Sequence, residues 1–275
     1  MTLTFIGGGN MASALIGGLV ARGQAVAGIR VVEPFAEARD RLRGAFPGIR
    51  ADDAVSAESL AGTAVVVLAV KPQQMRAAAT ALAPHLAGSS AVVLSIAAGI
   101  RLRELARWLG GHPRIVRAMP NTPALIGKGI SGVFAAPAVD EAGRAGAAAV
   151  LEAAGEVLWV GREADLDAVT GISGSGPAYV FYFLEALEVA ARDQGFDPAA
   201  ARRLAYATFA GAVALAQSSE LDPATLRAQV TSKGGTTERA IATMEVAGVK
   251  GQIVAAVAAA AERSRELGDA FAGDL

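Results

Sequence analysis

The sequence has no cysteine among its 275 residues and only two histidines, His85 and His112. The absence of cysteine excludes disulfides, thiolate zinc sites, iron–sulfur clusters and a cysteine nucleophile. With so few histidines, we expect no metal site and interpret both rings as surface or structural residues. The chemistry of this protein must therefore come from a bound cofactor, or from hydroxyls, carboxylates and backbone groups.

An excess of charge of one sign is also missing, because 25 basic side chains face 26 acidic ones, for a net charge of −1. This balance provides no electrostatic footprint for nucleic acid or an anionic membrane. Glycine or proline interrupts the three uncharged runs, 1–21, 77–100 and 168–184, which argues against spanning helices. The first run also lacks the positively charged start of a signal peptide. We expect a cytoplasmic protein that binds neither nucleic acid nor membrane.

The first part of the chain alternates short β-branched runs with longer helical stretches. The predicted strands are Leu3–Ile6, Ile29–Glu33, Ala64–Val70, Ala91–Ile96, Arg114–Ala118 and Gly155–Val160. The predicted helices between them are Asn10–Ala21, Phe35–Gly44, Gln73–Ala83, Arg101–Trp108 and Asp140–Ala154. Such alternation indicates βαβ units, and hence an α/β domain with a mainly parallel sheet covered by helices on both faces.

Strand patterns disappear after about Gly161, and the remaining sequence is typical of helices. The predicted helices are Pro177–Gln194, Pro198–Gln217, Pro223–Val230, Thr237–Ala247 and Lys250–Leu267. Proline is favoured in the first turn of a helix, and Asp197 and Asp222 stand where N-caps are expected. We predict an N-terminal α/β domain over residues 1–162 and an all-α domain over residues 163–275.

A glycine motif follows the first predicted strand and opens the first helix. Gly7-x-Gly9-x-x-Ala12 matches the dinucleotide fingerprint in its alanine form. The first glycine permits a tight turn, the second a close approach of backbone to pyrophosphate, and the alanine close packing of helix on strand. The helix N-terminus adds free N–H groups. A purely structural turn is the alternative.

The residue that discriminates between NADH and NADPH is expected near the end of the second strand. Glu33 lies at the distance along the chain where an acidic side chain binds the adenosine ribose, which favours NAD. It is equally compatible with a cap on the helix that starts near Phe35. Nearby arginines could instead bind a 2′-phosphate: Arg30, Arg39, Arg41 and Arg43. The cofactor choice therefore stays open.

Three further loops end predicted strands at the sheet edge where ligands of open α/β folds bind. The first is Ala69-Val70-Lys71-Pro72, where Lys71 contacts phosphate or is simply a solvated charge at a helix start. The second contains Ala97 and Ala98, whose small side chains allow a flat dinucleotide to lie against backbone. The third is Met119-Pro120-Asn121-Thr122-Pro123, a stiff loop whose Asn121 can donate and accept hydrogen bonds.

Two glycine-rich turns precede helices in the second domain. One is Ser173-Gly174-Ser175-Gly176-Pro177, and the other runs from Thr231 to Glu238 through Gly234-Gly235-Thr236-Thr237. Positive φ at Gly234 and Gly235 would point successive N–H groups into a concavity suited to a small carboxylate. Neither turn has Walker spacing, and each could be a simple helix cap.

Taken together, these motifs resemble the pyrroline-5-carboxylate reductase family over nearly the whole chain. The matching segments are Phe5–Met11, Val70–Pro72, Ser95–Gly99, Arg117–Pro123, Asp167–Gly171, Ser173–Tyr179 and Gly234–Thr237. The resemblance implies a Rossmann-type domain, a helical domain that interlocks with a second subunit, dimers often assembled into decamers, and a substrate site at the dimer interface. It implies reduction of 1-pyrroline-5-carboxylate to L-proline, with NADPH or NADH as cofactor.

The resemblance also assigns site residues. It implies that Thr237 is the catalytic residue near the ring nitrogen. It implies a substrate site made by Glu163, Ser175, Gly234, Gly235, Thr236 and Thr237. The cofactor site, from motif and resemblance together, comprises Ile6, Gly7, Gly8, Gly9, Asn10, Met11, Glu33, Ala69, Val70, Lys71, Pro72, Ala97, Ala98 and Asn121. Lys233 departs from the family, where many members have proline.

Two other functions compete with this one. The first is a dehydrogenase related to hydroxyacid dehydrogenases, which use a lysine or histidine as acid or base on the substrate-domain helices. The helical part offers only Lys233 and Lys250 and no histidine, which disfavours this function. The second is a dinucleotide-binding sensor without catalysis, which leaves the two carboxylate-suited turns unexplained.

Overall fold

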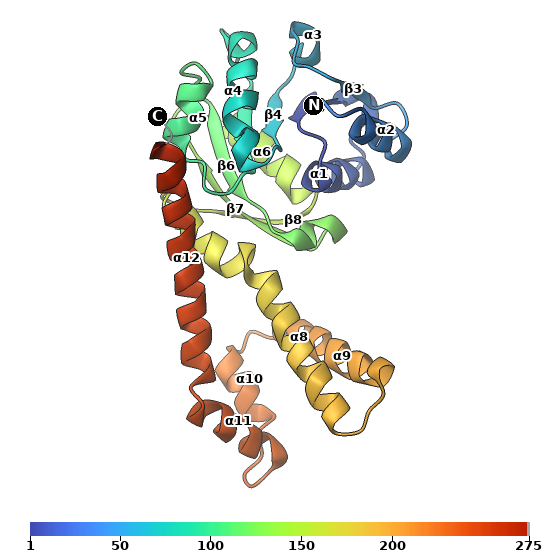
Figure 1. The fold of residues 1–275 in the computed structure, drawn as a ribbon, viewed down its shortest axis with the longest axis vertical. Helices are drawn as coiled ribbons and strands as arrows, with labels where there is room; N and C mark the ends of the chain where they lie inside the picture. Colours follow the sequence, from blue (N-terminus) through green and yellow to red (C-terminus); the bar gives the residue numbers. More distant parts are fainter. Residues whose placement is uncertain (274–275) are drawn as a thin grey trace. The chain divides into compact units, whose positions relative to one another are not determined.

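The computed structural model describes residues 1–273. In sequence order, its first strands and helices are β1 (Leu3–Ile6), α1 (Asn10–Ala21), a short 3-10 turn (Val26–Gly28), β2 (Ile29–Val32), α2 (Ala36–Ala45), β3 (Arg50–Asp52), α3 (Ala57–Leu60), β4 (Val65–Leu68) and α4 (Pro72–Leu86). They are followed by β5 (Val92–Ser95), α5 (Leu102–Trp108), β6 (Ile115–Met119), a 3-10 helix η2 (Thr122–Ile126), β7 (Gly129–Ala135), α6 (Glu141–Glu152) and β8 (Gly155–Trp159). Figure 1 shows these elements in order of colour.

The strands form one sheet in the order β3-β2-β1-β4-β5-β6-β7-β8. The first six follow the order 3-2-1-4-5-6 of the doubly wound nucleotide-binding fold. β1 lies between β2 and β4, so that Leu3 is opposite both Ile29 and Val65. β7 runs antiparallel to β6, and β8 runs parallel to β7. The strand order reverses between β1 and β4, which is where such folds bind dinucleotides.

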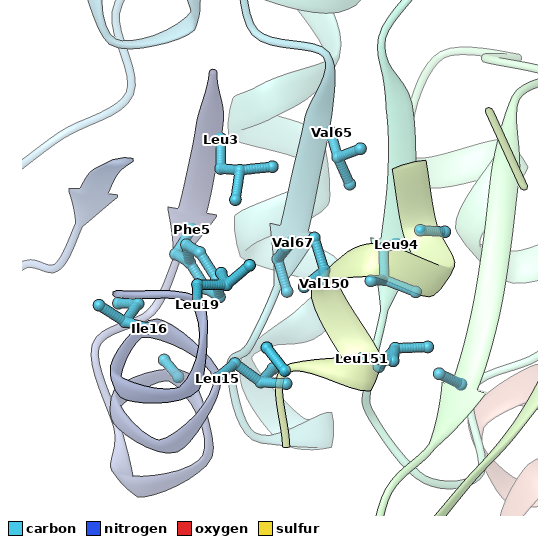
Figure 2. Close-up of a cluster of buried hydrophobic side chains, with 14 of the residues drawn as sticks. Leu3, Phe5, Leu15, Ile16, Leu19, Val65, Val67, Leu94, Val150 and Leu151 are labelled. Carbon is cyan, nitrogen blue, oxygen red and sulfur yellow. The ribbon is translucent and has the colours of Figure 1, made fainter. Parts of the chain in front are cut away.

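One face of the sheet is covered by α1 and α6. Alternate strand residues such as Phe5, Val67 and Leu94 point to this face, because successive side chains of a strand alternate between faces. They meet a stripe on α1 made by Ala12, Leu15, Ile16 and Leu19. Val150 and Leu151 of α6 complete the cluster, as Figure 2 shows. This packing fixes the start of α1 against the sheet edge.

The opposite face is covered by α4 and α5. The remaining strand residues, such as Ile6, Val66 and Leu68, pack there with Met75 and Leu82 of α4. The β4 sequence Val65-Val66-Val67-Leu68 is therefore buried on both sides, as expected for a central parallel strand. The sequence prediction of an α/β domain with helices on both faces is confirmed.

Two strands, β3 and β7, were not predicted from the sequence. β3 has only three residues, and two of them, Arg50 and Asp52, are charged. β7 contains Gly129 and Gly132, which lower strand propensity. Both glycines are required by packing, because a Cβ on Gly132 would lie 2.6 Å from Val169 and one on Gly129 would lie 2.9 Å from Ala124. Tertiary contact decides the structure here against local preference.

The segment from Asp165 is helical throughout and continues into the first long helix of the second part. It consists of α7 (Asp165–Val169), a π-helical turn η3 (Thr170–Gly174) and α8 (Gly176–Asp193). The remaining helices are α9 (Pro198–Gln217), α10 (Pro223–Gln229), α11 (Thr236–Val246) and α12 (Val249–Gly273). Asp197 and Asp222 cap α9 and α10 by accepting backbone N–H groups, as expected.

The chain divides into two compact units at points that differ from the expected boundary after residue 162. Unit 1 contains residues 1–175 and 259–275, and unit 2 contains residues 176–258. The last part of α12 belongs to unit 1 because its side chains are bonded there. Ser264 donates a hydrogen bond to Asp167, and Asp269 pairs with Arg101 at 2.7 Å. Phe271 packs against the cluster under α4 and α5.

Unit 2 has almost no core of its own. Of the residues described in it, only Leu184, Ala201 and Ala205 are buried. Large apolar side chains are exposed instead, including Phe181, Tyr182, Tyr206, Leu215, Val246 and Val254. Exposed apolar surface on this scale is typical of a protein–protein interface.

Among residues 1–273, no single helix is both long and apolar enough to cross a membrane. α11 and α12 pass that test only when taken together, and the two are bent by 52° at the break between them.

Candidate functional site

A cavity of about 680 Å³ lies at the carboxyl ends of β1, β2 and β4. It is lined by Gly7, Gly8, Gly9, Glu33, Phe35, Ala36, Glu37, Ala38, Arg41, Ala69, Val70, Lys71 and Gln74. These residues come from three loops that are distant in sequence but adjacent in the sheet. The cavity therefore occupies the topological switch point, as the glycine motif predicts.

Gly7, Gly8 and Gly9 differ in why glycine occupies each position. Gly7 has φ +99°, and a Cβ there would lie 2.7 Å from the carbonyl oxygen of Ala69. A Cβ on Gly8 would lie 2.6 Å from Leu42. A Cβ on Gly9 would have no heavy atom of the described structure within 4 Å. Packing within the chain therefore explains the first two glycines, whereas the third leaves open backbone in the lining of the cavity.

The start of α1 provides hydrogen-bond donors for phosphate. Gly9 is the N-cap, and no side chain caps the first turn. The first-turn N–H groups of Asn10 and Met11 have no partner within the helix and carry the positive end of its dipole. Ala12 is fully buried against the sheet, which confirms its expected role in close helix–strand packing.

Glu33 connects the second strand to the glycine turn. Its Oε2 accepts the N–H of Gly8 at 2.8 Å, and its Oε1 accepts the N–H of Phe35 at 3.0 Å. The side chain is only 7% exposed, yet it lines the cavity. The second bond goes to the N–H of Phe35, the N-cap residue of α2, and not to an N–H of its first turn, so Glu33 supports the start of α2 without capping it. The bond to Gly8 was not foreseen, and it ties the carboxylate to the dinucleotide motif.

Three of the four nearby arginines are bonded to backbone carbonyls and are not among the residues that line the cavity. Arg39 donates to the carbonyls of Glu33 and Pro34 at 2.7 and 2.8 Å. Arg43 donates to Ala51 and pairs with Asp40. Arg30 donates to carbonyls of the α3 segment, at 2.7 Å from Ala61. Of the four arginines considered, Arg41 is the one that lines the cavity.

The other predicted cofactor residues fall into two groups. Ala69, Val70 and Lys71 line the cavity, and Lys71 is the N-cap of α4, which Pro72 begins. Ile6 ends β1, next to the glycine turn. Ala97, Ala98 and Asn121 follow β5 and β6 and are outside the lining of this cavity. Phe35, Glu37 and Gln74 also line the cavity and were not predicted. They follow the ends of β2 and β4, and this position in the sequence was the signal that could have identified them.

Asn121 already forms structural hydrogen bonds. Its Oδ1 accepts the N–H of Ile130 at 3.0 Å, and its Nδ2 donates to the carbonyl of Ser173 at 3.1 Å. The residue is 9% exposed. Asn121 thus links the β6 end to β7 and to the π-helical turn, which accounts for the stiffness expected of this loop.

The predicted turn at Ser173–Pro177 is a π-helical turn rather than a free glycine loop. The N–H of Ser175 donates to the carbonyl of Thr170 at 2.9 Å. A Cβ on Gly174 would lie 2.6 Å from the terminal methyl group of Met119, so that side chain would have to move. The N–H of Ser175 is therefore not available to a carboxylate, which leaves its hydroxyl as the group for the predicted substrate role. π-Helical turns are frequent at functional sites.

Glu163 makes a junction inside unit 1. Its Oε1 accepts from Nη1 of Arg117 and from the N–H of Leu102, both at 2.6 Å. The contacts join β6, the start of α5 and the segment before α7. A smaller cavity of about 300 Å³ lies here, lined also by Arg101, Asp167 and Arg265. The predicted substrate role of Glu163 competes with this structural one.

The turn before α11 presents a different set of donors from the one expected. Gly234 has the expected positive φ of +74°, whereas Gly235 has φ −83°. The N–H of Gly234 donates to Oε2 of Glu238 at 2.7 Å, and that of Gly235 donates to the carbonyl of Ser232 at 3.0 Å. No side chain caps α11. The N–H groups of its first turn, beginning with Thr236 and Thr237, are therefore the donors that suit an anion.

The remaining candidates are structural. Nε2 of His112 lies 2.9 Å from the carbonyl oxygen of Ala91, and burial lowers the pKa of the His112 ring. This agrees with the structural interpretation of His112. Within the part of the chain that is described, no group of three or more His, Asp and Glu side chains could hold a metal ion.

Comparison with known proteins decides the family. Residues 163–267 match the family model for pyrroline-5-carboxylate reductase dimerisation, and residues 2–99 match that for NADP oxidoreductase, coenzyme F420-dependent. A pyrroline-5-carboxylate reductase of Pseudomonas aeruginosa is 46% identical over 97% of this chain and 97% of its own. The chain belongs to the pyrroline-5-carboxylate reductase family.

Solved structures agree with this family. The pyrroline-5-carboxylate reductase of Coxiella burnetii has a TM-score of 0.91 at 37% identity, over 97% of this chain and 98% of that one. The Plasmodium falciparum pyrroline carboxylate reductase, solved with NADP bound, has a TM-score of 0.85 at 27% identity, over 98% of each chain. The resemblance seen in the sequence motifs is confirmed over both units.

Proposed function

We propose that this chain reduces 1-pyrroline-5-carboxylate to L-proline with a reduced nicotinamide dinucleotide, the last step of proline biosynthesis. The observation that carries the proposal is the family relationship over 97% of the chain, at 46% identity to the Pseudomonas reductase. The geometry supports it with a dinucleotide cavity in unit 1 and an uncapped helix start at α11 in unit 2.

The cavity in unit 1 fits a dinucleotide. Open backbone at Gly9 and the N–H groups of the first turn of α1 would hold the pyrophosphate, and Glu33, which lines the same cavity, would bind the ribose. When bound, the cofactor supplies the hydride. Ala97 and Ala98, which follow the neighbouring strand, keep their predicted role as small residues beside the cofactor.

The first turn of α11 would hold the substrate carboxylate. Thr236 and Thr237 offer N–H groups at the positive end of the helix dipole, and their hydroxyls add further donors. In this proposal Gly234 shapes the turn through its positive φ, and Gly235 is the N-cap. Thr237, which is partly buried, would orient the ring nitrogen or relay a proton to it.

This reaction needs no strong base or metal. A protonated cyclic imine is already electrophilic, so the protein has to place the acceptor carbon against the hydride donor and anchor the carboxylate. A chain with no cysteine and two histidines can do this with backbone and hydroxyl groups. Ser175 and Glu163 remain proposed neighbours of the substrate.

We infer that unit 2 forms the dimer contact. Three buried side chains are too few for a helical unit of this size to be stable alone, and its exposed apolar residues need cover. The match of residues 163–267 to a dimerisation model supports this inference. A decamer and a cytoplasmic location remain predictions, tested by mass measurement in solution and by cell fractionation.

The deciding experiment measures oxidation of NADH and of NADPH by the purified chain in the presence of pyrroline-5-carboxylate. We expect turnover and formation of proline, detected by chromatography. Folded protein that binds dinucleotide but turns over neither cofactor would contradict the proposal and favour the sensor function. A hydroxyacid with the oxidised cofactor serves as the control for the dehydrogenase alternative.

A further inference from the structure

We propose that this chain selects NADH over NADPH, and that Glu33 is the residue that determines the choice. The inference rests on the proposed function in requiring a nicotinamide dinucleotide, and it concerns the adenosine end of the cavity in unit 1. The model that residues 2–99 match is that of an NADP oxidoreductase, and the lining of this cavity argues against that cofactor here.

The Glu33 carboxylate is fixed before any ligand arrives. Each of its oxygens accepts one backbone N–H, from Gly8 at 2.8 Å and from Phe35 at 3.0 Å. With 7% of its surface exposed, the side chain has little freedom to turn away. Its remaining exposure is toward the cavity that it lines. A negative charge is therefore held directly after β2, against Gly8 of the glycine motif.

A carboxylate in this place accepts hydrogen bonds but cannot donate them. It offers roughly four lone-pair sites, of which two are used by the N–H groups, so about two remain. The 2′- and 3′-hydroxyls of an adenosine ribose are donors that suit these sites. A 2′-phosphate at the same position brings about −1.5 to −2 charges and acceptor oxygens, so it is repelled.

The cations that would accommodate a 2′-phosphate are mostly committed elsewhere. Arg39 is held by two backbone carbonyls, and Arg43 by Ala51 and Asp40. Four charged side chains line the cavity, Glu33, Glu37, Arg41 and Lys71. Of these, Glu33 is the one that is buried and held by two backbone N–H groups. The fixed charge near the ribose position is therefore negative, and it favours a neutral hydroxyl over a phosphate.

Steady-state kinetics with both cofactors provides the first test. At a fixed concentration of pyrroline-5-carboxylate, we expect kcat/KM for NADH to exceed that for NADPH by at least about tenfold, because the 2′-phosphate and the Glu33 carboxylate repel each other. E33Q removes the charge while keeping one acceptor oxygen for a backbone N–H. We expect this variant to shift the ratio at least about tenfold toward NADPH.

E37Q is the matched control. It removes the same charge from the same cavity, but the Glu37 side chain is exposed and lies on the first turn of α2. We expect E37Q to change the NADH-to-NADPH ratio by less than about threefold, since exposed charges are screened. Thermal unfolding of E33Q and E37Q shows whether a changed ratio arises from loss of folding.

Binding of fragments without the nicotinamide separates this inference from the proposed reaction. Titration calorimetry with AMP and with adenosine 2′,5′-bisphosphate reports the ribose site directly, even if the chain turns over no imine. We expect AMP to bind the wild-type chain more tightly than the bisphosphate, and E33Q to reverse or abolish that order. Wild-type protein that prefers NADPH and the bisphosphate, with R41Q weakening only those two ligands, would overturn the inference and assign the choice to Arg41.

Discussion

Arg117 and Glu163 form an ion pair of 2.6 Å inside unit 1, and the same carboxylate oxygen holds the N–H of Leu102. Arg117 is 9% exposed and Glu163 28%, so water screens this pair less than it screens a surface pair. The Glu163 carboxylate thus joins three segments of unit 1: β6, the start of α5 and the segment before α7.

We expect Glu163→Gln to lower the free energy of unfolding by about 1.5–3 kcal/mol, the range for hydrogen bonds to charged groups. The amide keeps an acceptor for Leu102 but leaves Arg117 without its counter-charge. Denaturant titration measures the change, and Glu266→Gln, which breaks the exposed pair with Arg263, should cost less than about 1 kcal/mol. A stable Glu163→Gln protein with a raised KM for the imine would show that Glu163 contacts substrate.

Adjacent glycines of α1 should respond to alanine with opposite signs. A Cβ on Gly18 would overlap the carbonyl oxygen of Ala153, whereas one on Gly17 would meet Phe46 at an ordinary 3.7 Å. We expect Gly18→Ala to destabilise the protein by about 1–3 kcal/mol or more, through overpacking. Gly17→Ala should stabilise it by about 0.5–1 kcal/mol, because glycine inside a helix is unfavourable. The denaturation midpoint of each variant, compared with that of the wild type, shows whether Gly18→Ala lowers and Gly17→Ala raises the stability.

Acidification should destabilise the protein through His112. Burial lowers the pKa of His112 below its ordinary value of 6.5, so the unfolded chain takes up a proton at a higher pH than the folded chain does. The free energy of unfolding therefore falls as the pH drops from 6.5 toward the pKa of the folded state, and this contribution levels off below it. Urea titrations between pH 5 and pH 7 measure the slope.

His112→Gln can keep the hydrogen bond to Ala91 and should flatten that slope, while His85→Gln, at an exposed position, should follow the wild type. If the free energy of unfolding of both variants changed with pH by the same amount, the pH dependence would belong to groups other than His112.

Thr237 is expected to act on the substrate through its hydroxyl. Thr237→Ala should lower kcat by about 10²-fold, and Thr237→Ser should remain within about tenfold of the wild type, because positioned proton transfer contributes on this scale. The control on the same helix is Thr243→Ala, which loses only a bond from the hydroxyl to the carbonyl of Arg239. Unchanged turnover by Thr237→Ala would remove the proposed role.

The fold was largely predictable because its central strands and helices carry strong periodicity. The runs around Val65–Leu68 and the apolar stripe of α1 each specify an element without reference to the rest of the chain. β7 was not predictable in this way. Its glycines are set by contacts with Val169 and Ala124, which only the folded chain brings together.

The site was predictable in its motif but not in its hydrogen bonds. Gly7, Gly9 and Ala12 indicate a dinucleotide turn by spacing alone. That Glu33 accepts the N–H of Gly8, or that Glu238 takes the N–H of Gly234, depends on side-chain direction and local backbone geometry. Sequence spacing contains little information on such short-range choices of partner.

The division of unit 1 into residues 1–175 and 259–275 has a consequence for synthesis of the chain. Every residue lining the dinucleotide cavity precedes residue 75, and the sheet and helices that support it end with β8 at Trp159, so that site can form before unit 2 is made. Arg101 and Asp167 must wait for Asp269 and Ser264, which are synthesised after the whole of unit 2. The nascent protein should therefore be able to bind nucleotide before the C-terminal helix completes the unit, and translation of the whole of unit 2 separates the two events.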